Sequence, residues 1–229
     1  MGKIKNIAII PARGGSKRIV GKNYKNFNGL PIIANTINIL KKSNLFDKIF
    51  VSTDSKKITS IAERFGAEVP FIRPKKLSDD YATSVEVINH SVRYLKKIHD
   101  FEYACCVYAP NPFLQIKDLK KGYSLVKLKK VDFVFSATAY PFPFFRSLIL
   151  SKKGKIEMML KKNFFKRTQD LKKIFCDAGQ FYWGTKDAWL KKKTIYSKKS
   201  KIVSIPKWRY HDIDTAEDWK KAEKFIKIK

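Results

Sequence analysis

Paired glycines and a cluster of cations near the start of the chain have the spacing of an anion-binding loop. An apolar run over residues 6–10 stops at Pro11, and Gly14 and Gly15 follow it. Adjacent glycines allow a tight turn whose successive backbone N–H groups point at one anion. Basic side chains add positive charge to the same segment: Arg13, Lys17, Arg18 and Lys22. A buried strand that leads into such a turn indicates a site for a polyphosphate.

This segment also has a simpler interpretation, because lysine is abundant throughout the chain and glycines after a strand often form only a turn. Its spacing differs from that of the common phosphate loops. Gly21 follows Gly15 by six positions rather than the five of a Walker loop, and Asn23 replaces the Ser or Thr that would hold magnesium. A Gly-x-Gly-x-x-Gly dinucleotide turn is also absent. The segment therefore predicts a nucleotide that is held in another way.

Two carboxylates near the other end of the chain, Asp212 and Asp214, form a second candidate group. Residues two apart project to the same side of an extended backbone, so both could bind Mg²⁺ together with substrate phosphate oxygens. Alternatively, Asp214 is only a helix N-cap and Asp212 a surface charge. A phosphate loop in the same chain favours magnesium, because polyphosphate transfer requires charge neutralisation. We expect both groups to converge on one triphosphate, where the adjacent His211 could orient a carboxylate or bind pyrophosphate.

Short motifs in order along the whole chain resemble those of the CMP-sialic acid synthetase family. They are residues 9–18 with 21–23, residues 51–54, residues 71–74 with 77–80, and residues 211–215. Residues 177–184 are most similar to the pseudaminic acid branch of that family. The resemblance implies an enzyme that joins CTP to a nine-carbon 2-keto acid sugar and releases the CMP-sugar and pyrophosphate.

The resemblance also implies roles for individual residues. The predicted catalytic residues are Lys22, Arg13 and Asp214, and the predicted magnesium ligands are Asp212 and Asp214. The predicted nucleotide contacts are Ala12, Arg13, Gly14, Gly15, Ser16, Lys22, Asn23, Arg73, Thr83 and Tyr108. The predicted sugar contacts are Gln180 and Tyr182, for which packing within a strand is the alternative.

Several alternatives stay open at this point. Arg73 could instead form a salt bridge with Asp79 or Asp80. Tyr108 stands where the sialic acid enzymes usually carry the Gln of a Gln-Pro-Thr-Ser-Pro-like run, which favours pseudaminic acid over N-acetylneuraminate. Sister enzymes for neuraminic, legionaminic or KDO-like acids differ only in the sugar pocket. A glycosyltransferase with an Asp-x-Asp metal site and a basic nucleic-acid-binding protein are two further classes.

The formal charge of +29 over 229 residues would ordinarily indicate a nucleic acid or an anionic membrane as partner. The lysines, however, occur as doublets scattered over most segments, and arginine, which suits phosphate and base recognition, is modest in number. We therefore expect no specific nucleic acid partner.

No apolar run is long enough to span a bilayer, and residues 7–10 are too short for a secretory segment. We therefore expect a cytoplasmic protein without a membrane partner.

The elements that must position these residues follow from alternating patterns. Short apolar runs predict strands at residues 6–10, 49–52, 103–108, 133–137, 181–183 and 201–205. Helical spacing predicts helices that begin at Pro31, after Ser55, near Val85, near Lys117 and after Asp214. This order predicts an α/β, Rossmann-like nucleotidyltransferase fold with a mainly parallel mixed sheet flanked by helices. We expect residues 1–229 to form one domain.

Residues 140–175 interrupt this pattern. The segment is aromatic at its start and very polar over residues 161–173, and Gly154 is placed like the glycine of a hairpin turn. We expect an arm outside the main sheet, which in the resembled family mediates dimerisation and leans over the partner's sugar site. A loose surface hairpin is the alternative, but the aromatic density favours a buried contact. The resemblance implies that this contact joins a homodimer.

Overall fold

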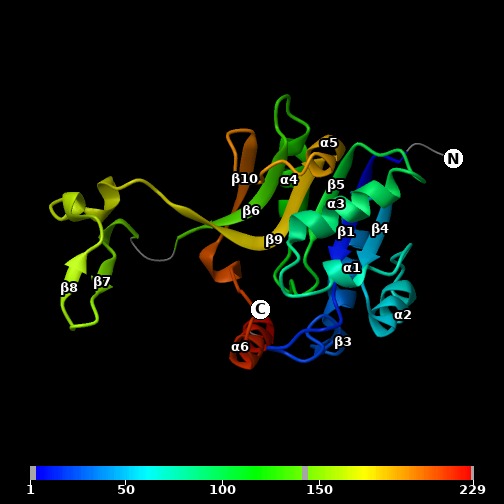
Figure 1. Ribbon diagram of the computed structural model, residues 1–229, viewed down its shortest axis with the longest axis horizontal. Coiled ribbons are helices and arrows are strands. Elements are labelled where there is room, and N and C mark those ends of the chain that lie inside the picture. The colour runs from blue at the N-terminus through cyan, green and yellow to red at the C-terminus, as the bar shows by residue number, and fades with distance from the viewer. Residues whose placement is uncertain (1–3, 141–143, 228–229) are drawn as a thin grey trace.

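A six-stranded sheet lies at the centre of the molecule (Figure 1). The computed structural model describes residues 4–140 and 144–227. The strands of this sheet are β1 (Asn6–Pro11), β4 (Lys48–Ser52), β5 (Tyr103–Val107), β6 (Phe133–Ala139), β9 (Phe175–Thr185) and β10 (Ser200–Ile205). They lie in the order β10-β6-β9-β5-β1-β4. β9 runs antiparallel to both of its neighbours and the other pairings are parallel, so the predicted mainly parallel mixed sheet is confirmed.

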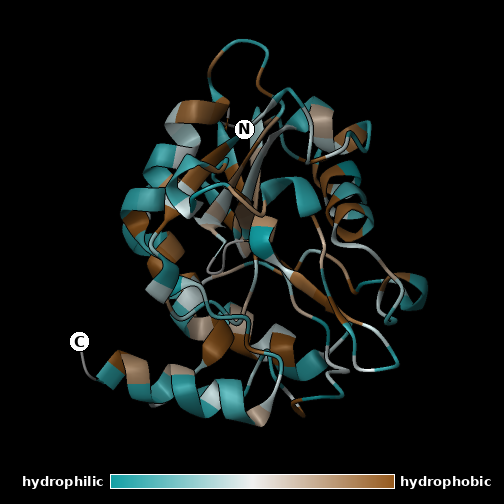
Figure 2. Cartoon of the chain, turned by 90° about the vertical axis from the view of Figure 1, so that its left-hand side faces the viewer, coloured by the Kyte–Doolittle hydropathy of each residue, from teal (hydrophilic) through white to brown (hydrophobic). Residues whose placement is uncertain are grey.

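Helices cover both faces of the sheet. Successive residues of a strand point to opposite sides, so the apolar strand residues pack against helices on each face. The helices are α1 (Ile32–Ser43), α2 (Lys56–Arg64), α3 (Ser84–Leu95), α4 (Ile116–Val126), α5 (Lys186–Leu190) and α6 (Ala216–Lys227). Cys105 belongs to a hydrophobic cluster with α1, α2 and α4, and Cys106 to a second cluster with α3 and α5. Figure 2 shows the hydrophobic strands between the two helical layers. None of the described helices is long and apolar enough to cross a bilayer.

Local signals explain where α2 begins and ends. The Ser55 side chain accepts a hydrogen bond from the backbone N–H of Ile58, as expected for an N-cap. Gly66 follows the helix with a φ of +88°, a left-handed conformation that glycine adopts without strain. The four remaining strands among the described residues form two short hairpins: β2 (Asn26–Phe27) with β3 (Leu30–Pro31), and β7 (Leu148–Leu150) with β8 (Ile156–Met158).

The last helix, α6, packs against the segment that follows β1. Trp219 and Ala222 of α6 are buried in a cluster with Ile19, Phe27 and Ile213. The rings of Phe27 and Trp219 meet edge-on, with their centroids 5.3 Å apart. This packing brings the residues just before α6 alongside the N-terminal loop.

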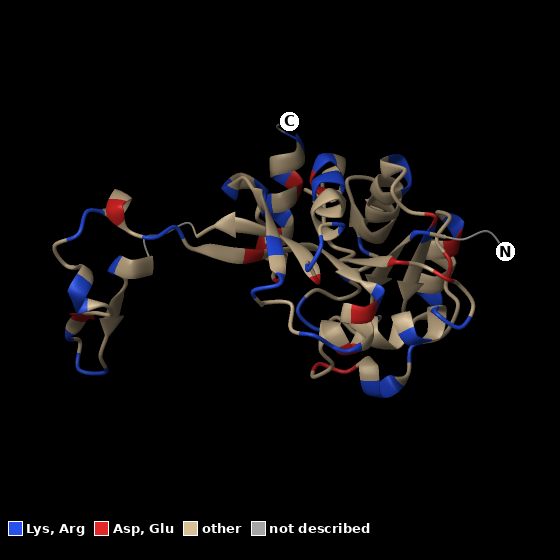
Figure 3. Ribbon diagram, turned by 90° about the horizontal axis from the view of Figure 1, so that it is seen from above, with Lys and Arg blue, Asp and Glu red and all other residues tan. Residues whose placement is uncertain are grey.

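Residues 144–174 form an arm that stands away from the rest of the molecule (Figures 1 and 3). β7 and β8 pair as an antiparallel hairpin, and Gly154 at its turn has a φ of +74°, as the sequence predicted. Three short 3-10 turns accompany the hairpin: η2 (Phe144–Arg146), η3 (Lys161–Asn163) and η4 (Thr168–Asp170). Three residues of the aromatic start of the predicted arm, 141–143, lie outside the described residues.

Candidate active site

The loop after β1 borders a cavity of about 530 Å³ at the carboxyl ends of the parallel strands β1 and β5. Four stretches supply most of its lining: residues 11–23, 73–87, 108–110 and 177–179. Residues 210–213, just before α6, complete it. This edge of an open α/β sheet is where ligands commonly bind.

Asp214 meets two cations of the N-terminal loop. Its Oδ1 atom lies 3.2 Å from Nζ of Lys22, and its Oδ2 atom lies 2.5 Å from Nη1 of Arg18. The Lys22 side chain is 19% exposed and that of Arg18 is 70% exposed, so Lys22 is the more enclosed of the two. The packing of α6 beside the loop thus brings together a cation and a carboxylate that the sequence placed at opposite ends of the chain.

A second carboxylate, Asp80, pairs with the other cations of the loop. Its Oδ1 atom lies 2.7 Å from Nη2 of Arg13, and its Oδ2 atom lies 2.6 Å from Nζ of Lys17. Hydrogen bonds from Lys17 and then from Arg13 lower the pKa of the Asp80 carboxyl. Sequence reasoning missed this pairing, although Asp80 lies in one of the motifs that carry the resemblance. The chain's own carboxylates therefore form ion pairs with the cations that we predicted to bind phosphate.

Asp212 lines the cavity, and we find no hydrogen bond or ion pair to it from residues 4–140 or 144–227. Burial and then the nearby Asp214 carboxylate raise its pKa, which marks a position where added positive charge is favourable. Within the described residues, no group of three or more His, Cys, Asp or Glu side chains could hold a metal. Two carboxylates fit Mg²⁺, which usually takes one or two protein ligands and fills the rest with phosphate oxygens and water.

His211 is oriented by groups other than a carboxylate. Its Nε2 atom lies 2.9 Å from the backbone carbonyl oxygen of Trp208. Its ring stacks on Phe113, with the centroids 4.4 Å apart. His211 also lines the cavity, so both expectations for it, orienting an aspartate or binding pyrophosphate, stay predictions.

At Gly14 and Gly21, but not at Gly15, the loop follows a path that larger residues could not take. The N–H of Gly14 donates to Oδ1 of Asp54 at 2.8 Å, and a Cβ atom at Gly14 would lie 2.9 Å from the Cβ of Ser55. Gly21 has a φ of +65°, and a Cβ atom there would overlap the ring of Tyr24. The Gly14 N–H, which was predicted to point at a ligand, thus already has a carboxylate acceptor.

The loop residues predicted to contact the nucleotide differ in their access to the cavity. Those that line it are Arg13, Ser16, Lys22 and Asn23. Those outside the lining are Ala12, Gly14 and Gly15. Nδ2 of Asn23 donates to the backbone carbonyl of Arg13 at 2.9 Å, so Asn23 also holds the loop closed on itself.

Arg73 lines the cavity while its side chain is anchored from behind. It is 5% exposed, and its guanidinium donates to the backbone carbonyl and to Oγ of Ser52. Burial lowers the pKa of Arg73 to about 10, against the opposing effect of the Asp54 charge. The alternative salt bridge with Asp79 or Asp80 is not found among the described residues.

Tyr108 also lines the cavity, whereas Thr83 does not. The Tyr108 hydroxyl lies 2.6 Å from Oγ of Ser84, and burial raises its pKa. Thr83 is the N-cap of α3 and forms a reciprocal capping box with Glu86. A nucleotide contact by Thr83 stays a prediction, and its visible role is to start the helix that carries Ser84.

The two predicted sugar contacts on β9 lie behind the cavity lining. Gln180 is 4% exposed, and its Nε2 donates to the backbone carbonyl of Arg209 at 3.0 Å. The Tyr182 hydroxyl donates to Oδ2 of Asp177 at 2.6 Å, and the Tyr196 hydroxyl donates to the same oxygen at 2.7 Å. Asp177 itself lines the cavity, so Tyr182 contacts a lining residue but does not line the cavity itself. Sequence reasoning missed Asp177, although this residue opens the motif at 177–184.

Known proteins are similar to this chain in sequence and in fold. The cytidylyltransferase family model matches residues 7–227. The pseudaminic acid cytidylyltransferase of Campylobacter jejuni subsp. jejuni serotype O:23/36 is 38% identical over 226 residues, which cover 98% of this chain and 97% of that protein. The CMP-N,N'-diacetyllegionaminic acid synthase of Legionella pneumophila is 30% identical over 97% of this chain and 96% of its own. A solved structure of CMP:2-keto-3-deoxy-manno-octonic acid synthetase complexed with CTP has the same fold, with a TM-score of 0.71 at 14% identity over 98% of this chain and 99% of the other. The chain therefore belongs to the cytidylyltransferase family.

Proposed function

We propose that this chain catalyses the reaction of CTP with pseudaminic acid to give the CMP-sugar and pyrophosphate. The anomeric oxygen of the sugar forms a bond to the α-phosphorus, and the bond from that phosphorus to the oxygen bridging to the β-phosphorus breaks. The electron pair leaves with pyrophosphate, and the hydroxyl proton passes to a base. One observation carries the proposal: Lys22 lines the cavity and pairs with Asp214, which lies just outside the lining, in a chain of the cytidylyltransferase family.

The cations of the loop would bind the triphosphate and stabilise the charge that develops on the departing pyrophosphate. We assign the main catalytic role to Lys22, because its partly buried side chain acts in a lower dielectric than that of the exposed Arg18. Arg13 would add a second charge once a phosphate replaces Asp80 as its partner. The catalytic set is therefore Lys22, Arg13 and Asp214.

Asp212 and Asp214 would hold Mg²⁺. Asp212 supports this assignment because its carboxylate has no partner among the described residues and its pKa is raised. When bound, the ion would neutralise phosphate charge. Asp214 would at the same time keep Lys22 close to the phosphates.

The nucleotide and the sugar would share the rest of the cavity. We propose Ser16, Asn23, Arg73 and Tyr108 as nucleotide contacts because they line it. The identity of 38% to the Campylobacter jejuni relative, against 30% to the legionaminic acid enzyme, supports pseudaminic acid as the sugar. Asp177, backed by Tyr182, lies on the wall left for the sugar.

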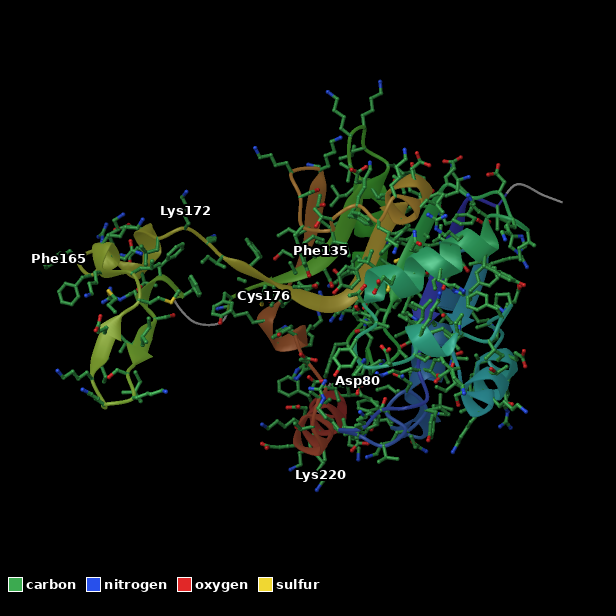
Figure 4. The ribbon with its side chains drawn as sticks, viewed as in Figure 1. Asp80, Phe135, Phe165, Lys172, Cys176 and Lys220 are labelled. Atoms are coloured by element: carbon green, nitrogen blue, oxygen red, sulfur yellow. The ribbon has the colours of Figure 1, made fainter. Side chains whose placement is uncertain are left out.

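We also propose that the protein works as a homodimer, joined through the arm. Leu150 is 70% exposed, Ile156 is 65% exposed and Phe165 is 94% exposed. Figure 4 shows Phe165 at the outer end of the arm, away from the sheet. Several exposed apolar side chains on one small arm are typical of an interface between proteins. The cytoplasm remains the proposed location.

Pyrophosphate release with CTP and a panel of sugars, with and without Mg²⁺, tests the proposed activity. We expect release only with Mg²⁺, and fastest with pseudaminic acid. Faster release with legionaminic, N-acetylneuraminic or KDO-type acids would reassign the sugar. The absence of release with every acid would overturn the activity and would favour a glycosyltransferase or a binding protein.

A further inference from the structure

A buried ion pair lies directly before the segment that carries Asp212. Arg209 ends the 3-10 turn η5 (Lys207–Arg209) and is 2% exposed. Its Nη1 donates to Oδ2 of Asp118, whose side chain is 8% exposed and belongs to the first turn of α4. The pair ties the chain after β10 to α4. Neither residue lines the cavity, and neither was singled out from the sequence.

Two hydrogen bonds extend this contact to the neighbouring strands. Nε2 of Gln180 in β9 donates to the backbone carbonyl of Arg209 at 3.0 Å. The backbone carbonyl of Gln180 accepts from Nδ2 of Asn111 at 2.8 Å, and Asn111 follows Pro110, which lines the cavity. Gln180 and Asn111 are 4% and 6% exposed. A buried polar chain thus joins α4, β9 and the loop after β5 at the position of Arg209.

The segment from Arg209 to Asp214 is short and fixed at both ends. Arg209 is held by the buried polar chain. Ile213 is 3% exposed and is buried in the same cluster as Trp219 of α6. Asp212 lies between these two anchors, and Asp214 follows the second directly. A displacement of Arg209 would therefore reach Asp212 over only three residues, with no longer loop to absorb it.

Burial of this ion pair is hard to explain by stability alone. Removing two charges from water is unfavourable, and well-packed apolar residues of similar size often stabilise a fold equally well. A planar guanidinium paired with a carboxylate does, however, fix direction and distance. We infer that Arg209 and Asp118, supported by Gln180, are positioning residues that hold Asp212 and Asp214 in place for a divalent cation bound with CTP. This inference rests on the proposed function and adds to it residues that do not touch the substrates.

The test separates positioning from stability by replacing both charges with apolar side chains. In the double variant Arg209→Met/Asp118→Leu no unpaired charge remains, so we expect a thermal unfolding midpoint near that of the wild type. CTP binding is measured by calorimetry without sugar, once with Mg²⁺ and once with a chelator. We expect the gain in CTP affinity from Mg²⁺ to fall about tenfold, as for other residues that orient metal ligands, while binding in chelator changes little.

The pair formed by Lys193 and Asp132 provides a matched control. Their charged atoms are 2.7 Å apart, and the side chains are 36% and 16% exposed and lie outside the cavity lining. Lys193→Met/Asp132→Leu should keep the full gain in CTP affinity from Mg²⁺, which we call the magnesium effect.

If the double variant Arg209→Met/Asp118→Leu fails to fold, Gln180→Met replaces it, because this change removes a hydrogen bond to Arg209 without unpairing a charge. It should weaken the magnesium effect and leave the KM for the sugar unchanged.

The outcomes distinguish this inference from the proposed function. An unchanged magnesium effect in the double variant, or in Gln180→Met where that variant replaces it, overturns the inference alone. A raised sugar KM in Gln180→Met with the magnesium effect intact also overturns it and returns Gln180 to the sugar site. A wild-type protein that binds no CTP overturns the proposed function. A wild-type protein that binds CTP equally well in Mg²⁺ and in chelator overturns both the magnesium assignment and this inference.

Discussion

The cavity beside the N-terminal loop and the arm of residues 144–174 differ in how their side chains are partnered. At the cavity, cations of the loop meet Asp214 and Asp80, which come from distant parts of the same chain. On the arm, Leu150 and Phe165 face solvent, and the side chain of Arg146 donates to the backbone carbonyl of Lys166, another arm residue. Four cations of the loop are thus paired with carboxylates of the same chain, whereas these apolar groups of the arm are left exposed by it.

This contrast indicates that the two regions have separate tasks. Cations that pair with partly exposed carboxylates can exchange a carboxylate for a phosphate, because exposed ion pairs are weak. An uncovered apolar surface instead favours association with another protein surface. We therefore expect changes at the cavity to alter turnover and CTP binding, and changes on the arm to alter assembly.

The largest expected effect follows from removing either member of the pair between Lys22 and Asp214. Lys22→Ala and Asp214→Ala should each lower kcat by at least about a hundredfold, because a preorganised charge at the reacting phosphates is lost. The free energy of unfolding should fall by no more than about 1 kcal/mol, since the pair is partly exposed. Pyrophosphate release and chemical denaturation measure the two quantities.

Lys48→Ala is the matched control for this prediction. Lys48 pairs with Glu68 at 2.6 Å, its side chain is 32% exposed, and neither residue lines the cavity. This variant should keep normal turnover. Near-normal turnover by Lys22→Ala or Asp214→Ala would contradict the catalytic assignment and leave the cavity without its proposed task.

The next effect concerns the arm. Leu150→Glu should weaken self-association about tenfold or more, because a charge would have to be buried in an apolar contact. CTP binding should be unchanged. Light scattering after size-exclusion chromatography, over a range of concentrations, measures the oligomeric state. Leu128→Glu is the control, since Leu128 is 49% exposed but lies on the main body after α4. Equal association of both variants and the wild type would argue against the arm as the interface.

Local sequence signals predicted most of the elements, because these elements depend on neighbouring residues. The apolar run at residues 6–10 forms β1, and Ser55 starts α2. The residue after Asp214, Thr215, shares reciprocal hydrogen bonds with Asp218 at the start of α6. Trp219 of α6 is buried against the segment after β1, and this packing brings Asp214 to the loop. The long-range meeting itself was predicted from the chemistry of the two groups, a phosphate loop and a pair of carboxylates, and not from the helical pattern.

The surroundings of Gln180 could not be predicted in the same way. Alternation along β9 places Gln180 and Tyr182 on one side of the strand, but it does not say what covers that side. The register between β6 and β9 shifts between Phe135 and Ala137. At this irregularity Oγ of Ser136 accepts the N–H of Gln180 at 3.0 Å. Such a bulge is a property of two paired strands, so one strand's sequence does not reveal it.

A smaller effect should come from Asp80, which competes with phosphate for Arg13 and Lys17. Asp80→Asn should tighten CTP binding by up to about fivefold at low salt, since exposed ion pairs of this kind are weak. Calorimetry without sugar measures it. Glu68→Gln is the control, because it removes the same charge away from the cavity. Weaker CTP binding by Asp80→Asn would mean that Asp80 shapes the loop rather than competes for its cations.

The smallest expected effect is a gain in stability for Asp212→Asn. Burial and then Asp214 raise the pKa of Asp212, so the fold disfavours its ionised form. At neutral pH in chelator, the variant should therefore unfold at a slightly higher temperature, with a difference in unfolding free energy within about 0.5 kcal/mol. Thermal unfolding over a range of pH values measures it.

The pH dependence of this effect has a definite sign. The penalty on wild-type stability is complete above the raised pKa of Asp212 and vanishes below the unfolded value of about 3.9, because the carboxyl is then protonated in both states. The advantage of Asp212→Asn should shrink accordingly as the pH falls. Asp218→Asn should unfold at a lower temperature than the wild type at neutral pH, and this difference should shrink as the pH falls. The reason is that hydrogen bonds from Thr215 lower the pKa of Asp218 and stabilise the fold at neutral pH.

With Mg²⁺ and CTP added, the wild type should instead unfold at a higher temperature than Asp212→Asn, because the bound cation stabilises only the protein that keeps its carboxylate. An unchanged order would argue against a cation at this end of the cavity.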